Sequence, residues 1–175
     1  MRLIVPLLVG LAAAGCATGP GAAGPGWIVA PGVEAVLQEE EVDCGAAALA
    51  SVFNYWEIPN SLDELRESCA LGPAGIAAAE LRDAARERGL EAYLIRAGWD
   101  DLVHELSRGR PVLAGVVRSG RAHYVVVSGL NAGRGRILLV DPAGGRSEQA
   151  RSRFEADWSA AANLALVVFR REEGR

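Results

Sequence analysis

The feature that most constrains the fold is a nearly unbroken apolar run, CGAAALASVFNYW, at residues 44–56. Its clearly polar members are Ser51 and Asn54. A helix that is apolar on every side has to be covered on every side, which places it inside a domain and not on its surface. The run therefore predicts one central, buried helix with Cys44 in its first turn.

The size and charge of the chain limit what can be built around this helix. A chain of 175 residues, half of them apolar, has enough apolar surface for one compact domain. The formal net charge of −4, with basic residues scattered and not interleaved with aromatic ones, argues against a nucleic-acid partner. Two histidines and three widely spaced cysteines do not make a zinc-site pattern, so we expect no metal and no cofactor.

The first residues, MRLIVPLLVGLAAAGC, have the pattern of a targeting segment. One positive charge at Arg2 precedes an apolar run at residues 3–14 that is too short to cross a bilayer as a helix. The ending AAGC resembles a bacterial lipoprotein signal, which implies that residues 1–15 are removed and that Cys16 is lipidated. The lipid would hold the protein at the outer membrane or the periplasmic face. An ordinary secretory signal, with Cys16 left as a free thiol, is the alternative.

The rest of the chain divides by composition. Residues 16–32 are rich in Gly, Pro and Ala and predict a flexible tether, 33–170 a folded domain, and 171–175 a charged tail. After the buried helix, further helices are expected at 61–69, 75–89, 99–109 and 154–161, the first opened by a capping box of Ser61 and Glu64. Strands are expected at 90–96, 111–117, 122–130, 136–140 and 164–169. Helices first and strands later predict an α+β domain with an antiparallel sheet packed on the buried helix.

Cys44 stands where a cysteine nucleophile would be activated. The unsatisfied N–H groups and the dipole at the start of a helix favour an anion there, and therefore a thiolate. The other interpretation is a small core residue, because free cysteines are often buried. Glu39, Glu40, Glu41 and Asp43 precede the cysteine and would oppose the thiolate. We expect the glutamates to lie on a solvated loop where their charges are screened, or else to form an acidic lip that favours basic substrate residues.

A histidine and an aspartate occupy matching places in two consecutive predicted strands. His123 begins the first, Asp141 ends the second, and their midpoint at Ala132 falls in the turn sequence NAGRG. In a hairpin symmetric about Ala132 they would be directly opposite, with Cβ atoms about 4.5 to 5.5 Å apart. This pair would supply a base for Cys44 and a group that orients the base. Alternatively, these are a satisfied sheet-edge histidine and a turn-forming aspartate before proline; His104, within a charged helix, is a weaker candidate base.

Gln38 lies six residues before Cys44. From there its amide can donate to the oxyanion that forms when a thiolate attacks a carbonyl, alongside the backbone N–H of Cys44. The alternative for Gln38 is a solvated loop residue.

Four elements in this order resemble the bacteriocin-processing cysteine peptidases, papain-like domains that cut leader peptides after a double glycine. They are Gln38, DCGAA at 43–47, AHYVVVSG at 122–129 and VDPAGG at 140–145, and the similarity extends over roughly residues 33–169. The resemblance implies a papain-like fold with Gln38 at the oxyanion hole, Cys44 as nucleophile, His123 as base and Asp141 as orienter. Transporter-linked members carry membrane-spanning and ATPase domains that this sequence lacks, so a free-standing lipoprotein with a different substrate is expected.

These expectations combine into a membrane-anchored cysteine peptidase that cleaves an exported protein or peptide through a thioester to Cys44. One alternative is a non-catalytic module that binds a peptide in a peptidase-like cleft. Another is a hydrolase of peptidoglycan cross-bridges that uses the same cysteine and histidine. A disulfide between Cys44 and Cys69 would silence the thiol, but we favour a buried, free Cys69.

Overall fold

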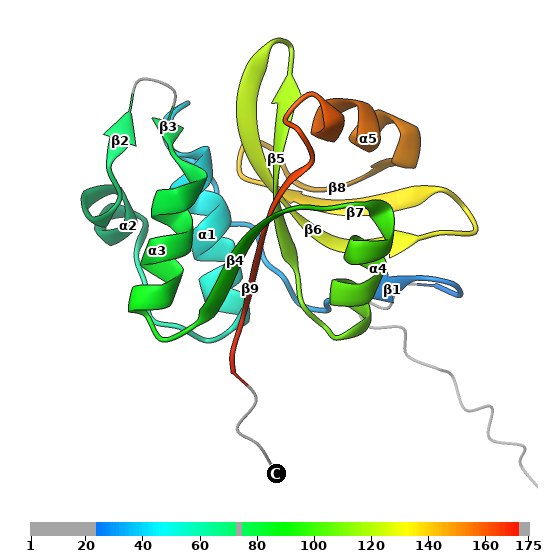
Figure 1. Ribbon diagram of the computed structural model, residues 1–175, viewed down its shortest axis with the longest axis horizontal. Coiled ribbons are helices and arrows are strands. Elements are labelled where there is room, and N and C mark those ends of the chain that lie inside the picture. Colours follow the sequence, from blue (N-terminus) through cyan, green and yellow to red (C-terminus); the bar gives the residue numbers. More distant parts are fainter. Residues whose placement is uncertain (1–23, 73–74, 172–175) are drawn as a thin grey trace, which may run out of the picture.

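The computed structural model describes residues 24–72 and 75–171, which form an α+β domain (Figure 1). The predicted signal peptide with Cys16, part of the predicted tether and most of the charged tail lie outside these residues. Three helices stand together on one side of the domain: α1 (Cys44–Tyr55), α2 (Leu62–Ser68) and α3 (Ala78–Glu87). No helix within the described ranges is long and apolar enough to cross a membrane.

The other side of the domain is a curved antiparallel sheet with the strand order β4-β9-β5-β6-β7-β8 (Figure 1). Its strands are β4 (Glu91–Arg96), β5 (Val112–Arg118), β6 (Arg121–Asn131), β7 (Arg136–Asp141), β8 (Gly145–Ala150) and β9 (Leu164–Phe169). Two further helices, α4 (Trp99–Ser107) and α5 (Arg151–Ser159), pack on the sheet. The predicted α+β class and antiparallel sheet are confirmed.

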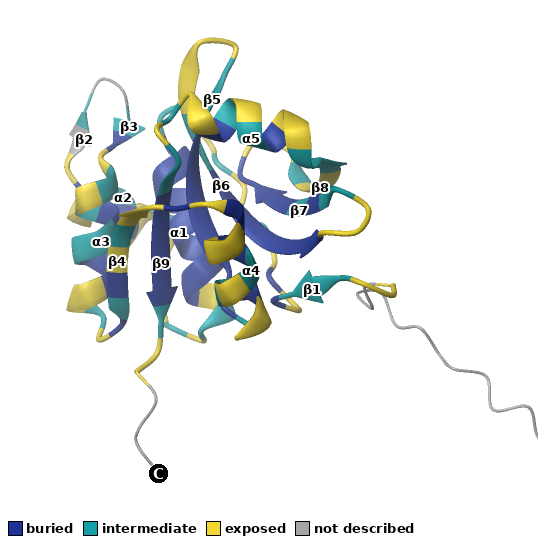
Figure 2. Ribbon diagram, turned by 45° about the vertical axis from the view of Figure 1, so that its right-hand side comes forward, coloured by how far each residue is buried: buried dark blue, intermediate teal, exposed yellow. Residues whose placement is uncertain are grey.

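Helix α1 is buried as the sequence predicts. All ten residues at 44–53 are buried, and the helix packs on β6, α2 and α3 (Figure 2). Its small residues allow close approach, since a Cβ at Gly45 would lie 3.3 Å from the ring of Tyr124 on β6. The polar Ser51 is satisfied, because its hydroxyl donates to the Ala47 carbonyl at 2.9 Å and accepts the Val36 N–H at 2.9 Å. The helix thus fixes Cys44 firmly in the core.

Ordered structure begins earlier than the composition indicates. Strand β1 (Ile28–Val29) pairs with Gly129 and Leu130 of β6, next to the part of β6 that pairs with β5. Ala30 after it is 1% exposed. The end of the segment interpreted as a tether is therefore part of the sheet, because backbone pairing outweighs its Gly- and Pro-rich composition.

Two other elements differ from the expectations. Helix α3 begins at Ala78 and not at residue 75, because β3 (Gly75–Ile76) pairs with β2 (Leu71–Gly72). Strand β8, with the polar sequence GRSEQA, was not expected; it lies at the edge of the sheet and is largely exposed. The capping box of Ser61 and Glu64 is confirmed at the start of α2.

The β6–β7 hairpin is not symmetric about Ala132. Its paired residues run from Asn131 with Arg136 to Gly129 with Leu138, and then continue with Val127 opposite Leu139. Ser128 is therefore the extra residue of a β-bulge. Continued along this register, Asp141 comes opposite Val125, two residues from His123. The prediction that His123 and Asp141 are directly opposite is wrong; they are diagonal neighbours.

The bulge decides on which face these two side chains lie. Without the extra residue, the register near the turn would bring Asp141 opposite Val126, three residues from His123. Because side chains alternate between the faces of a strand, the two would then point to opposite faces. Ser128 restores a separation of two residues, and both side chains point to the same face. Bulges are known to re-aim side chains near active sites in this way.

The contact between β1 and Gly129 yields a stability prediction. A Cβ at Gly129 would lie 2.7 Å from Cγ1 of Val29 and 3.1 Å from Cδ1 of Leu138, so a Gly129→Ala variant has to push β1 off the sheet. We expect a loss of about 1–3 kcal/mol, the usual cost of overpacking, measured by urea unfolding. Gly133→Ala is the matched control, because its Cβ would meet nothing closer than 3.7 Å. Equal unfolding midpoints for the two variants would contradict the prediction.

Candidate active site

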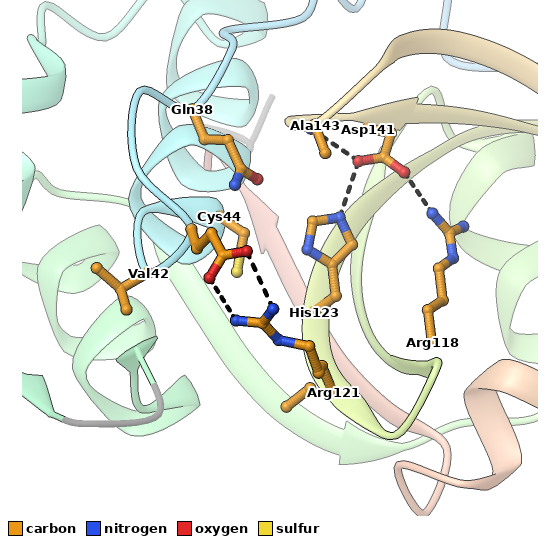
Figure 3. A pocket seen from close by; sticks show the side chains of 10 residues that line it. Gln38, Val42, Cys44, Arg118, Arg121, His123, Asp141 and Ala143 are labelled. Carbon is orange, nitrogen blue, oxygen red and sulfur yellow. Dashed lines mark hydrogen bonds and ion pairs between the residues drawn. The ribbon is translucent and has the colours of Figure 1, made fainter.

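All four residues that the sequence analysis singled out line one pocket of about 460 Å³: Gln38, Cys44, His123 and Asp141 (Figure 3). Its walls come from the loop before α1, the first turn of α1, and the strands β5, β6 and β7. Four side chains that are up to 103 residues apart in the chain (141 minus 38) therefore meet at one place. His104 does not belong to this group, since it lies on α4 with a side chain 57% exposed.

The carboxylate of Asp141 holds the ring of His123. The distance from Nε2 of His123 to Oδ1 of Asp141 is 2.8 Å. The same oxygen accepts the N–H of Ala143 at 2.9 Å, and Oδ2 accepts from the guanidinium of Arg118. With both oxygens of Asp141 bound, the imidazole is fixed between Asp141 and Cys44, and its Nδ1 is left on the side of the thiol (Figure 3).

The electrostatics of the site favour a protonated histidine. Burial alone would lower the pKa of His123, but its hydrogen bond to Asp141 and its interaction with Cys44 outweigh burial and raise the pKa to about 9. Burial raises the pKa of Asp141, but His123, the N–H of Ala143 and Arg118 lower it to about 2. At neutral pH an imidazolium therefore lies beside Cys44, where a cation stabilises a thiolate. Burial and the charge of Cys44 raise the pKa of the neighbouring Tyr124 to about 12, so that its phenol stays neutral.

The backbone N–H groups in the first turn of α1 are free to interact with Cys44. Asp43, which precedes the helix, makes no side-chain capping hydrogen bond and so does not occupy the free N–H groups of the first turn. Cys44 and Cys69 are both free thiols, and no disulfide joins them. Burial raises the pKa of Cys69, which keeps that residue a neutral thiol in the core.

The carboxylates before Cys44 are matched by cations. Arg66 of α2 pairs with Glu39 at 2.9 Å and with the buried Asp43. Glu41 pairs with Arg121 of β6 through two contacts of 3.0 and 2.6 Å. Most of the negative charge that would oppose a thiolate is thereby neutralised. The acidic lip considered from the sequence is not a free surface, because two of its three glutamates are in ion pairs.

Gln38 is held at the pocket by its backbone and by its amide. Its N–H donates to the carbonyl of Pro142 at 3.0 Å, which ties this loop to the residue after Asp141. Its Nε2 donates to the carbonyl of Glu40 at 3.0 Å, while Oε1 is buried and has no partner among the described residues. An amide nitrogen carries two N–H donors, so the second one remains for a ligand in the pocket.

The sequence analysis missed Arg118, which lines the pocket and binds Asp141. Arg118 is directly opposite Arg121 across a two-residue turn in which Ser119 and Gly120 have positive φ of 51° and 76°. The dipeptide Ser-Gly between two apolar runs was the signal for this turn. It would have placed both arginines on one side of the hairpin, close to His123.

The raised pKa of His123 predicts how stability depends on pH. His123 keeps its proton up to about pH 9 in the folded state but loses it near pH 6.5 in the unfolded state. Protonated His123 therefore contributes its full stabilisation of the fold below pH 6.5. That contribution disappears as the pH rises from 6.5 through about 9. The depressed pKa of Asp141 adds a contribution that is lost as the pH falls from 3.8 towards 2. We expect urea unfolding to show the alkaline loss in the parent and a smaller loss in Asp141→Asn.

An NMR titration provides the direct measurement, since the chain contains two histidines. The resonance that disappears in His123→Gln is followed in the parent and in Asp141→Asn. A parental midpoint at the ordinary value of 6.5 would contradict the assignment.

Comparison with known proteins places this geometry in a family. Residues 33–173 match the model of the peptidase C39 family. The transport/processing ATP-binding protein ComA of Streptococcus pneumoniae is 34% identical over 124 residues, which are 70% of this chain and 17% of that protein. The lactococcin-G-processing and transport ATP-binding protein LagD of Lactococcus lactis is 26% identical over 125 residues, 71% of this chain and 17% of that protein. The chain thus spans less than a fifth of the length of these relatives.

Solved structures show the same fold. The peptidase domain of Streptococcus ComA has a TM-score of 0.67 at 24% identity and covers 80% of this chain and 100% of its own. A double glycine motif protease from an AMS/PCAT transporter, in complex with the leader peptide, has a TM-score of 0.64 at 26% identity, with coverages of 77% and 89%. A C39-like peptidase from Bacillus anthracis has a TM-score of 0.72 at 14% identity, with coverages of 83% and 98%. Since the family model spans most of the chain and the fold agrees with these structures, the chain belongs to the peptidase C39 family of cysteine peptidases.

Proposed function

We propose that this protein is a lipid-anchored cysteine peptidase that cleaves a peptide bond of an exported protein or peptide. Cys44 is the nucleophile, His123 the general acid and base, Asp141 the group that orients His123, and Gln38 a donor to the oxyanion. The observation that carries the proposal is the shared pocket, in which Asp141 holds His123 at 2.8 Å and His123 lies next to Cys44 at the start of α1.

The first half of the reaction forms a thioester. The Cys44 thiolate attacks the scissile carbonyl carbon, and the carbonyl electron pair moves to the oxygen. The resulting oxyanion accepts from the backbone N–H of Cys44 and from the free N–H of Gln38. His123 then gives the proton on Nδ1 to the leaving nitrogen as the C–N bond breaks.

The second half releases the acid. Neutral His123 takes a proton from water while the water oxygen attacks the thioester carbonyl. The C–S bond breaks, and the thiolate of Cys44 is restored beside the imidazolium. Asp141 keeps the ring in one orientation during both halves, because its two oxygens are bound by Ala143 and Arg118 as well as by His123.

The choice of substrate rests on the relatives and on the N-terminal sequence. One solved relative is a protease in complex with a leader peptide, which favours a peptide substrate for this chain as well. The signal peptide and the lipidation of Cys16 that the sequence predicts support a location on the far side of the cytoplasmic membrane. An exported polypeptide is therefore a better candidate substrate than a cytosolic leader peptide.

The mechanism predicts a specific loss in Gln38→Ala. Removing one oxyanion donor lowers kcat by about 100- to 1,000-fold and changes KM little, since the donor acts mainly in the transition state. The substrate for this measurement comes from comparing N-terminal peptides of cells that carry the parent or Cys44→Ala. Leu37→Ala is the matched control, because Leu37 is the neighbouring residue, is 57% exposed and does not line the pocket.

The role of Cys44 has its own test, which also separates an enzyme from a module that only binds peptides. An iodoacetamide or epoxide probe is expected to label the parent at Cys44, and Cys44→Ala is expected to lose both the label and the cleavage of the identified substrate. Cleavage at the parental rate by Cys44→Ala would refute the proposed nucleophile. A substrate that is bound but never cut by the parent would support the binding module instead.

The anchor is tested by fractionation. We expect the parent to sediment with membranes and Cys16→Ser to be released, because the lipid is the attachment that the sequence predicts. Cys44→Ser serves as the control, since it also replaces a cysteine but leaves the lipidation sequence intact. Membrane attachment of Cys16→Ser equal to that of the parent would show that the lipid on Cys16 is not the anchor.

A further inference from the structure

An ion pair lies across the pocket beside the proposed nucleophile. Glu41 and Arg121 both line the pocket that contains Cys44. Both oxygens of Glu41 are engaged, by Nη1 of Arg121 at 3.0 Å and by Nη2 at 2.6 Å. The two side chains are 75% and 68% exposed, so the pair faces the solvent from which a substrate enters.

The pair connects the two walls of the pocket. Glu41 belongs to the loop before α1, three residues from Cys44. Arg121 is the first residue of β6 and lies two residues before His123. Side chains two apart on a strand point to the same face, so Arg121 and His123 share one side of the sheet. The Glu41–Arg121 pair therefore borders the pocket in which a peptide would meet Cys44 and His123.

The energetics of such a pair make it easy to open. Exposed ion pairs contribute little to stability, because water and salt screen them and two long side chains have to be ordered. The intact pair nevertheless offers no net attraction to a charged substrate residue. Such a residue is attracted by one member of the pair and repelled by the other, so it gains nothing over an uncharged residue. The nearby cation Arg118 does not alter this, because Asp141 and Asp157 already bind it.

We propose that Glu41 and Arg121 determine the charge specificity of this peptidase. While they are paired, the pocket accepts an uncharged substrate residue next to the scissile bond in preference to an acidic or a basic one. Removal of Glu41 turns Arg121 into a site for an acidic residue, and removal of Arg121 turns Glu41 into a site for a basic one. This inference rests on the proposed function, in which Cys44 is the attacking atom.

The first experiment needs no knowledge of the substrate. Cys44 in the full chain is treated with methanethiosulfonates that carry a neutral methyl, an anionic sulfonatoethyl or a cationic trimethylammonioethyl group. The thiolate attacks the reagent sulfur, a disulfide bond forms, and methanesulfinate leaves. Peptide mass spectrometry follows the rate at Cys44 separately from the other cysteines.

The expected result is an exchange of preferences between the two single variants. In Glu41→Gln the rate of the anionic reagent relative to the neutral one rises by about two- to fivefold, the range typical of exposed charge pairs. In Arg121→Gln the relative rate of the cationic reagent rises by a similar factor. The double variant Glu41→Arg with Arg121→Glu rebuilds the pair and returns both ratios to the parental values. Added salt reduces each change, because it screens the exposed charge that is left.

A second exposed ion pair controls for the change in net charge. Arg136 of β7 and Glu148 of β8 are 2.7 Å apart, and neither lines this pocket. Arg136→Gln and Glu148→Gln are expected to leave all three rates at Cys44 unchanged. Equal shifts in these controls and in the pocket variants would overturn the proposal, as would single pocket variants with unchanged ratios.

The same variants are then compared on the identified substrate with Asp, Asn or Lys next to the scissile bond. The proposal expects kcat/KM to favour Asn in the parent, Asp in Glu41→Gln and Lys in Arg121→Gln. Failure of the charge proposal is distinguishable from failure of the proposed function. If the rate ratios do not change but Cys44 is labelled normally, only the charge proposal is overturned. If Cys44 of the parent does not react with the neutral reagent, the result counts against the proposed function.

Discussion

The rest of the structure depends on the burial of α1 from its first residue. A helix with ten consecutive buried residues has one place in a domain of this size, between the sheet and the neighbouring helices. Because the helix is buried from its first residue, Cys44, the sulfur is fixed at the point where the helix reaches the pocket. The loop before the helix is fixed with it, since Ser51 holds the N–H of Val36 and Pro142 holds the N–H of Gln38. Packing and two hydrogen bonds, one to the Ser51 hydroxyl and one to the Pro142 carbonyl, thus position both the cysteine and the glutamine.

The charged groups around Cys44 favour a thiolate, because the imidazolium of His123 lies beside it while most of the nearby carboxylates form ion pairs with arginines. His123 keeps its proton because Asp141 and Cys44 outweigh the effect of burial. Asp43 is buried directly before the cysteine, but its carboxylate is bound by Arg66, which lowers its pKa. In the sequence QEEEVDC, four carboxylates precede the cysteine and would be expected to destabilise a thiolate. In three dimensions the side chains of Glu39 and Asp43 point to α2 and that of Glu41 points across the pocket to Arg121.

Much of the site was predictable from the sequence, and the exceptions have physical reasons. The apolar run at 44–56 identified the central helix, and the spacing of His123 and Asp141 identified a hairpin that brings them together. The details of that hairpin were not predictable, because Ser128 is an ordinary strand residue by composition and becomes a bulge through pairing with neighbouring strands. Strand β1 was missed for the same reason, since two residues have no period to recognise and are ordered by Gly129 and Leu130. The pairing of Glu41 with Arg121 joins residues 80 apart and has no local signal.

The position of the bulge also has a consequence for protein engineering. The pairs Val127 with Leu139 and Val126 with Val140 lie between the bulge and the proposed catalytic residues, and they hold the alignment of His123 with Asp141. The turn at residues 132–135 lies beyond the bulge, at the far end of the hairpin from the chemistry. We expect an epitope or fluorescent reporter inserted into this turn to leave the catalytic alignment in place, because the pairs on the other side of the bulge hold that alignment. The turn is therefore a natural attachment point for labels with which to follow the protein in cells.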